Sequence, residues 1–112
     1  MTIAIVILNW NGRQLLERFL PTVLTHAAGA QVYVADNAST DSSVDFLRTH
    51  YPQVSILQNP TNEGYAAGYN RALQQVQADV YCLLNSDVAV TEGWLSPDRK
   101  STRLNSSHEI PS

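Results

Sequence analysis

The sequence has very few of the residues that mark several common functional classes. Cys82 is its only cysteine, so the chain contains neither a disulfide framework nor a thiolate metal site. Lys100 is its only lysine, the net charge is −3, and no basic cluster occurs in the body of the chain. A nucleic-acid-binding surface is therefore not expected. No stretch approaches the roughly 20 apolar residues that a membrane-spanning helix needs.

Familiar catalytic and phosphate-binding motifs are missing as well. Only Gly12 follows the first apolar run, so the dinucleotide fingerprint G-x-G-x-x-G is absent, and neither a phosphate loop nor a G-x-S-x-G nucleophile elbow occurs. The apolar start, residues 3–8, has no basic region before it and no small-residue cleavage site after it. These features predict a first β-strand rather than a signal peptide, and a cytoplasmic chain is the default expectation.

Four short apolar runs alternate with segments in which apolar residues recur at helical spacing. The runs at 3–8, 31–35, 54–57 and 80–84 are rich in residues that favour strands buried on both faces. Strands that alternate with helices and short connections are joined by right-handed crossovers into a parallel sheet. The predicted fold class is α/β, with a mostly parallel sheet between two layers of helices.

Polar side chains follow three of the four predicted strands. The carboxyl ends of parallel strands meet at one edge of a sheet, where ligands of open α/β sheets bind. Carboxylates that converge on such a rim repel each other but suit a hard divalent cation. Asp36 and Asp41 also have a purely structural interpretation as turn or cap residues. The residues at these strand ends are Asn9, Trp10 and Asn11, then Asp36, Asn37 and Asp41, and finally Asn85 and Asp87.

Two glycines stand in the helical segment that begins near Glu63. Gly64 and Gly68 each lower helix stability by up to about 1 kcal/mol relative to alanine. Glycine at such positions indicates the close approach of another group, either a neighbouring element or a ligand. Both interpretations remain open at this point.

Four sequence motifs together resemble the amino-terminal half of family 2 inverting glycosyltransferases, in the rhamnosyltransferase-like branch of the GT-A fold. Each motif is weak alone, but they occur in family order and spacing across residues 1–97. The resemblance implies a Rossmann-like GT-A domain that is truncated after its fourth strand. The motifs are IVILNWNG at 5–12, VADNASTD at 34–41, NEGYAAGYN at 62–70 and LLNSDV at 83–88.

The resemblance implies a nucleotide-diphosphate sugar as donor and a glycan, lipid-linked or other hydroxyl acceptor, as in cell-wall or polysaccharide biosynthesis. Asp36 would accept a hydrogen bond from the nucleotide base, and Asp87 would hold the divalent cation, Mg²⁺ or Mn²⁺. Asn85 stands where such enzymes carry the first carboxylate of a D-x-D-like motif, and is left to contact ribose or water. The substrate-binding residues expected by resemblance are Asn9, Trp10, Asn11, Asp36, Asn62, Gly64, Asn70 and Asn85.

The general base of the family is an aspartate or glutamate in the carboxyl-terminal half, which we expect this chain to lack. We therefore expect the fragment to be inactive in sugar transfer. Association with a membrane is expected only for a full-length protein that contains this domain. Two other classes remain as alternatives. A nucleotidyltransferase would need a glycine-rich basic loop after the first strand, where only Gly12 and Arg13 occur. A receiver-like domain would need a lysine near the site, and residues 1–97 contain none.

Residues 98–112 do not follow the alternating pattern. They are polar and aperiodic, and contain three of the seven basic residues of the chain. This composition predicts a disordered tail. The string also resembles translated adapter sequence at the end of a gene assembly, so we predict an artefact rather than part of the domain.

Overall fold

The computed structural model describes residues 2–27, 29–86 and 107–111, the last five by their backbone only. The four predicted strands are present, each within one residue of its predicted bounds. Helices lie between them, as the helical spacings indicate. The elements in chain order are β1 (Ile3–Asn9), α1 (Arg13–Thr25), β2 (Gln31–Asp36), α2 (Ser43–His50), β3 (Ser55–Gln58), α3 (Tyr65–Leu73), β4 (Val80–Asn85) and β5 (Ser107–Pro111).

The first four strands form a parallel sheet in the order β3-β2-β1-β4. This confirms the predicted α/β class. Because β1 lies between β2 and β4, its last residues have a partner on both sides. Asn9 is in register with Asp36 of β2, and Leu8 is in register with Asn85 of β4. The polar strand ends are thereby brought to one edge of the sheet.

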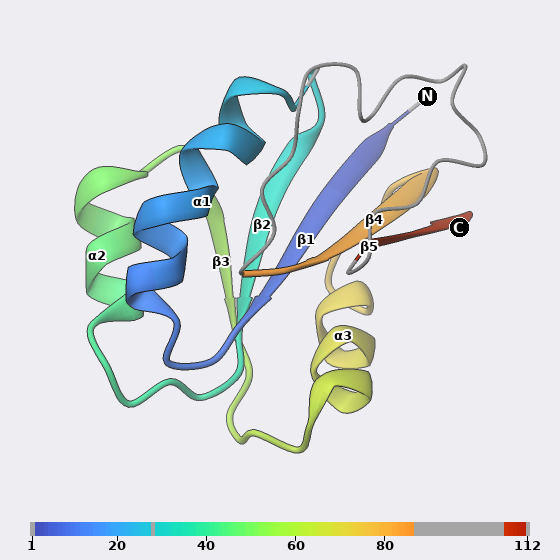
Figure 1. The fold of residues 1–112 in the computed structure, drawn as a ribbon. Helices are drawn as coiled ribbons and strands as arrows, with labels where there is room; N and C mark the ends of the chain where they lie inside the picture. Colours follow the sequence, from blue (N-terminus) through green and yellow to red (C-terminus); the bar gives the residue numbers. More distant parts are fainter. Residues whose placement is uncertain (1, 28, 87–106, 112) are drawn as a thin grey trace.

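The side chains of β1 alternate between two hydrophobic cores. Ile5 and Ile7 pack with α1 and α2 on one face, while Val6 and Leu8 pack with α3 on the other. Figure 1 shows this arrangement, with α1 and α2 on one side of the sheet and α3 on the opposite side. Burial on both faces explains why β1 is an unbroken apolar run rather than an alternating one. Cys82 is buried in the first core, as expected for a small apolar residue.

The fifth strand differs from the prediction for residues 98–112. Ser107–Pro111 pairs antiparallel with β4, with Tyr81 opposite Ile110. The disordered, artefactual tail over residues 98–112 stays a prediction as a whole, although these five residues form a strand. The reason is that β4 would otherwise expose unpaired backbone N–H and C=O groups, which pair with any extended segment that reaches them. Residues 98–106 lie outside the described part of the chain.

Within residues 2–27 and 29–86, no helix is long and apolar enough to cross a membrane.

Candidate functional site

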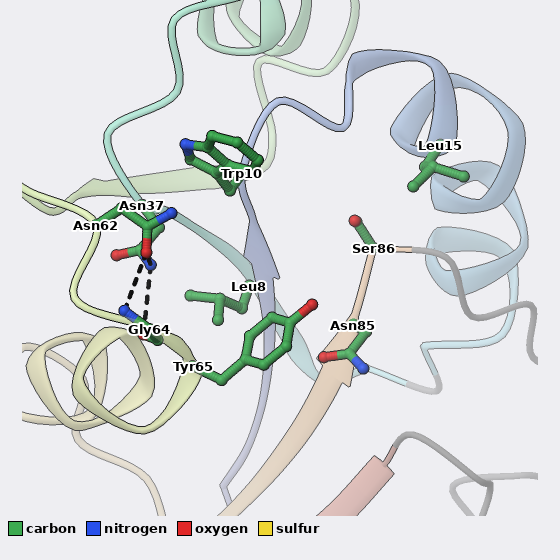
Figure 2. A pocket seen from close by; sticks show the side chains of 9 residues that line it. All are labelled: Leu8, Trp10, Leu15, Asn37, Asn62, Gly64, Tyr65, Asn85 and Ser86. Carbon is green, nitrogen blue, oxygen red and sulfur yellow. Dashed lines mark hydrogen bonds between the residues drawn. The ribbon is translucent and has the colours of Figure 1, made fainter.

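A pocket of about 340 Å³ opens at the carboxyl edge of the parallel sheet. Its volume is in the range of small-molecule sites, which begins near 300 Å³. The pocket lies between the loop after β1, the start of α3 and the end of β4 (Figure 2). Its lining residues are Leu8, Trp10, Leu15, Asn37, Asn62, Gly64, Tyr65, Asn85 and Ser86.

The lining combines exposed apolar side chains with neutral amides. Trp10, Leu15 and Tyr65 are 54%, 39% and 67% exposed, and they are the large hydrophobic side chains that stand out to solvent among the described residues. All three line this one pocket. None of the lining residues in the described part of the chain carries a charged side chain. A flat, uncharged ring with hydrogen-bonding edges is the ligand chemistry that such a lining suits.

Asp36, at the end of β2, is almost fully buried and is not among the lining residues. Its Oδ1 accepts hydrogen bonds from Asn9 Nδ2 at 3.0 Å and from the Ser39 hydroxyl at 2.7 Å. Its Oδ2 accepts one from the Ser39 backbone N–H at 3.0 Å. The carboxylate thus joins the end of β1 to the loop after β2. Asn9 is fully buried and likewise does not line the pocket.

Asn11 has a left-handed backbone, with φ at +50°, and its side chain turns toward the loop after β2. Asn11 Oδ1 accepts hydrogen bonds from the backbone N–H groups of Thr40 at 2.7 Å and Asp41 at 3.2 Å. Its own backbone N–H donates to the Ser39 hydroxyl at 2.9 Å. The structure therefore places Asn11 as a support for the loop that carries Trp10, and not in the pocket wall.

Asp41 connects this loop to two helix starts. Asp41 Oδ2 accepts a hydrogen bond from the Arg13 backbone N–H at 3.2 Å, and Oδ1 accepts one from the Ser43 backbone N–H at 2.9 Å. Burial acts to raise the pKa of Asp41, but the hydrogen bonds from Ser43 and Arg13 outweigh it and lower that pKa below 3.8. Asp41 therefore accepts hydrogen bonds from the first N–H group of each helix, which is a structural role, while the N-cap positions are Gly12 and Ser42.

The wall formed by α3 depends on both glycines, for different reasons. Gly64 has φ at +96°, which favours glycine, and a Cβ there would meet nothing within 4 Å. A Cβ on Gly68 would lie 2.9 Å from Leu8 Cδ1 and 3.2 Å from the Asn37 amide. Gly68 therefore serves close packing, and Gly64 serves the turn into α3. Asn70 is exposed on α3 and is not a lining residue.

The fourth strand ends in Asn85, which lines the pocket together with Ser86. The Tyr69 hydroxyl donates its one proton to the Leu84 carbonyl oxygen at 2.6 Å, and Asn85 Oδ1 lies 3.2 Å away as a second, longer acceptor. Asp87, the predicted metal ligand, lies outside the described residues. Among the residues that the structure describes, no group of three or more His, Cys, Asp or Glu side chains is placed to hold a metal ion.

Of the eight predicted binding residues, Trp10, Asn62, Gly64 and Asn85 line the pocket. The sequence interpretation did not select five other lining residues. Leu15 and Tyr65 belong to apolar helical spacings, and their exposure is visible only in the fold. The strand-end position of Asn37, directly after Asp36, was the signal that pointed to it. The five lining residues not selected are Leu8, Leu15, Asn37, Tyr65 and Ser86.

Comparison with known proteins supplies the family. The family described as "Glycosyl transferase family 2" matches residues 4–97. The chain belongs to glycosyl transferase family 2. An N-acetylglucosaminyl-diphospho-decaprenol L-rhamnosyltransferase of Mycobacterium tuberculosis is 37% identical over 62 residues, which is 54% of this chain and 20% of the relative. A pre-mycofactocin glycosyltransferase of the same species is 33% identical over 78 residues, or 68% of this chain and 16% of the relative.

Solved structures share the fold of this family 2 domain. The mannosyltransferase PcManGT from Pyrobaculum calidifontis, in complex with GDP-Man and Mn²⁺, matches with a TM-score of 0.70 at 20% identity. That match covers 86% of this chain and 29% of the mannosyltransferase. TarS of S. aureus matches with a TM-score of 0.73 at 20% identity, over 85% of this chain and 18% of TarS. The chain therefore has the GT-A fold, and it spans about a fifth of the curated relatives that it matches.

Proposed function

We propose that this chain is the nucleotide-sugar-binding part of an inverting glycosyltransferase, which transfers a sugar from a nucleotide-diphosphate sugar to an acceptor hydroxyl. The observation that carries the proposal is the aromatic and amide-lined pocket at the carboxyl edge of the sheet in a family 2 domain. The related mannosyltransferase structure contains GDP-Man and Mn²⁺, and a TarS structure contains UDP-GlcNAc. Both ligands support a nucleotide-diphosphate sugar as the donor.

The nucleotide base is the part of the donor that the pocket suits best. Trp10 and Tyr65 present exposed rings, and stacking of a base on an aromatic side chain contributes about 1–3 kcal/mol. Asn62 and Asn85 supply amide groups for the base edge or the ribose. A carboxylate has about four acceptor sites. Asp36 uses three of them within the chain, so one site on Oδ2 remains for a base N–H.

The divalent cation, Mg²⁺ or Mn²⁺, is proposed to bind at Asp87, directly after Asn85 and Ser86. These two residues offer neutral oxygen atoms at the pocket rim, and hard cations are held by oxygen ligands from carboxylates, amides and water. When bound, such a cation would neutralise negative charge on the departing nucleoside diphosphate. The role of the described residues is to hold the base and ribose beside that position.

We also propose that residues 1–97 do not supply the general base. The described lining residues include no aspartate or glutamate, so none of them can take the proton of an acceptor hydroxyl as a carboxylate base. Loss of general-base assistance lowers rates by about 10²–10⁴-fold. Transfer by this chain alone is therefore expected to be undetectable, while binding of the nucleotide remains.

Isothermal titration calorimetry tests the binding proposal. We expect UDP or GDP with MnCl₂ to bind the unmodified chain, and Trp10→Ala to weaken binding about tenfold or more because the stacking surface is removed. Gln53→Ala, at an exposed position of the described chain outside the pocket lining, is the matched control and should bind as the unmodified chain does. Absence of binding heat for UDP, GDP and dTDP, with and without Mn²⁺, would contradict the proposal.

A further inference from the structure

Three amide and backbone groups hydrogen-bond to one buried side chain in the pocket wall. Asn37 is only 2% exposed, although it directly follows β2 in a loop. Its Oδ1 accepts a hydrogen bond from Asn59 Nδ2 at 3.1 Å. Its Nδ2 donates to Asn62 Oδ1 at 2.9 Å and to the Gly64 carbonyl oxygen at 3.4 Å. Figure 2 shows hydrogen bonds of this cluster that run to Gly64, on the side of the pocket where α3 begins.

The same Asn62 oxygen has a second partner. Asn62 Oδ1 also accepts a hydrogen bond from the Gly64 backbone N–H at 3.0 Å. Asn62 therefore turns its oxygen toward two donors, one from Asn37 and one from the turn into α3. Gly64 has φ at +96°, so the direction in which the chain enters α3 is set at this residue.

Three further contacts give Asn37 a fixed position. Its backbone N–H donates to the Asn9 carbonyl oxygen at 2.8 Å, which attaches it to the end of β1. Asn59 Nδ2 also donates to the Gly68 carbonyl oxygen at 3.3 Å, which attaches the same group to α3. The missing Cβ of Gly68 leaves the space that the Asn37 amide occupies, since a Cβ there would lie 3.2 Å from both amide atoms.

We propose that Asn37 is a positioning residue, whose buried amide fixes the turn at Asn62 and Gly64 and thereby holds Tyr65 as the pocket wall at the start of α3. This positioning role should tighten the binding of a nucleoside diphosphate, and only that consequence rests on the proposed function. Asn37 acts through Asn62 and Gly64, so its amide orientation matters more than its size.

Asn37→Asp tests the orientation without changing the shape of the side chain. The new carboxylate still accepts from Asn59, but it faces Asn62 Oδ1 and the Gly64 carbonyl oxygen with no proton to donate. Asn62 can relieve the repulsion only by rotating its amide, which then turns an NH₂ group toward the Gly64 N–H. That rotation leaves the Gly64 N–H without its acceptor.

The experiment combines amide hydrogen exchange by NMR with calorimetric titration of UDP and GDP in MnCl₂. In Asn37→Asp we expect faster exchange at Gly64 and Gly68, unchanged exchange at Val6 and Val34 in the central strands, and about tenfold weaker nucleotide binding. Gln53→Glu introduces the same charge at an exposed position and should change neither readout. Unchanged exchange at Gly64 in a folded Asn37→Asp variant would overturn the proposal, whether or not affinity falls.

Two further outcomes separate the positioning role from the proposed function. If the unmodified chain binds no nucleotide, the proposed function fails, while the exchange rates at Gly64 still decide the role of Asn37. If Asn37→Asp does not fold, NMR of the Asn37 side chain in the unmodified chain tests the positioning role instead. Slow exchange of the Asn37 side-chain NH₂ protons, with nuclear Overhauser contacts to Asn62 and Gly64, would support the role. Fast exchange without those contacts would overturn it.

Discussion

Gly68→Ala sets two well-defined effects against each other at the pocket wall. Gly68 lies inside α3, where alanine is favoured over glycine by about 1 kcal/mol. Against this gain, the new Cβ would lie 2.9 Å from Leu8 Cδ1 and 3.2 Å from the Asn37 amide. Leu8 is 3% exposed and Asn37 is held by hydrogen bonds, so neither can move away easily. Overpacking of this kind costs about 1–3 kcal/mol.

The expected net effect is a loss of about 1 kcal/mol in the free energy of unfolding, measured by urea denaturation. Ala66→Gly, at an exposed position of the same helix, is the control for helix propensity alone and should lower stability by up to about 1 kcal/mol. A Gly68→Ala variant as stable as the unmodified chain, or more stable, would refute the argument that Gly68 is required by close packing against Leu8 and Asn37.

Three other predictions follow from the site. Asp36→Ala should weaken nucleotide binding by about 1–3 kcal/mol, because it removes the carboxylate oxygen that is proposed to accept a hydrogen bond from the nucleotide base, and equal affinities in calorimetry would remove this role. Asp41 has a lowered pKa, so its contribution to stability is present above pH 3.8 and is lost as the pH falls through the folded-state pKa. The stability difference between the unmodified chain and Asp41→Asn in urea should therefore shrink between pH 6 and pH 3, and a constant difference would contradict the assignment. Incubation with radiolabelled sugar nucleotides and a mixed acceptor pool should give no transfer above the level of an Asp87→Ala control.

The sheet could be predicted from sequence because its cause is local. A run such as residues 3–8 is short, apolar at every position and rich in β-branched residues, which is typical of a strand buried on both faces. Parallel order then follows from the alternation with helices. Parallel order also predicts that the polar strand ends gather at one edge of the sheet. It does not predict which of these side chains face a ligand.

The directions of the individual side chains depend on contacts between residues distant in sequence. Asn9 and Asn11 follow a strand end just as Trp10 does, but their amides bond to Asp36 and to the Thr40 backbone, 27 and 29 residues away. Only Trp10 is left to the pocket. Leu15 belongs to an apolar helical spacing that favours burial, yet it is 39% exposed at the pocket. The spacing of apolar residues and the residue types carry no information about such hydrogen bonds between residues distant in sequence.

The most direct test of the central claim is to locate the nucleotide by NMR chemical-shift mapping on the unmodified chain. Titration with UDP or GDP in MgCl₂ is predicted to shift the backbone amides of Trp10, Gly64 and Asn85 most strongly, since these residues line the pocket from three different elements. A second hollow, lined by Thr2, Asp79 and Tyr81 at the start of β1 and β4, serves as the internal control. Shifts confined to that hollow, or absent from all of the pocket residues, would contradict the account.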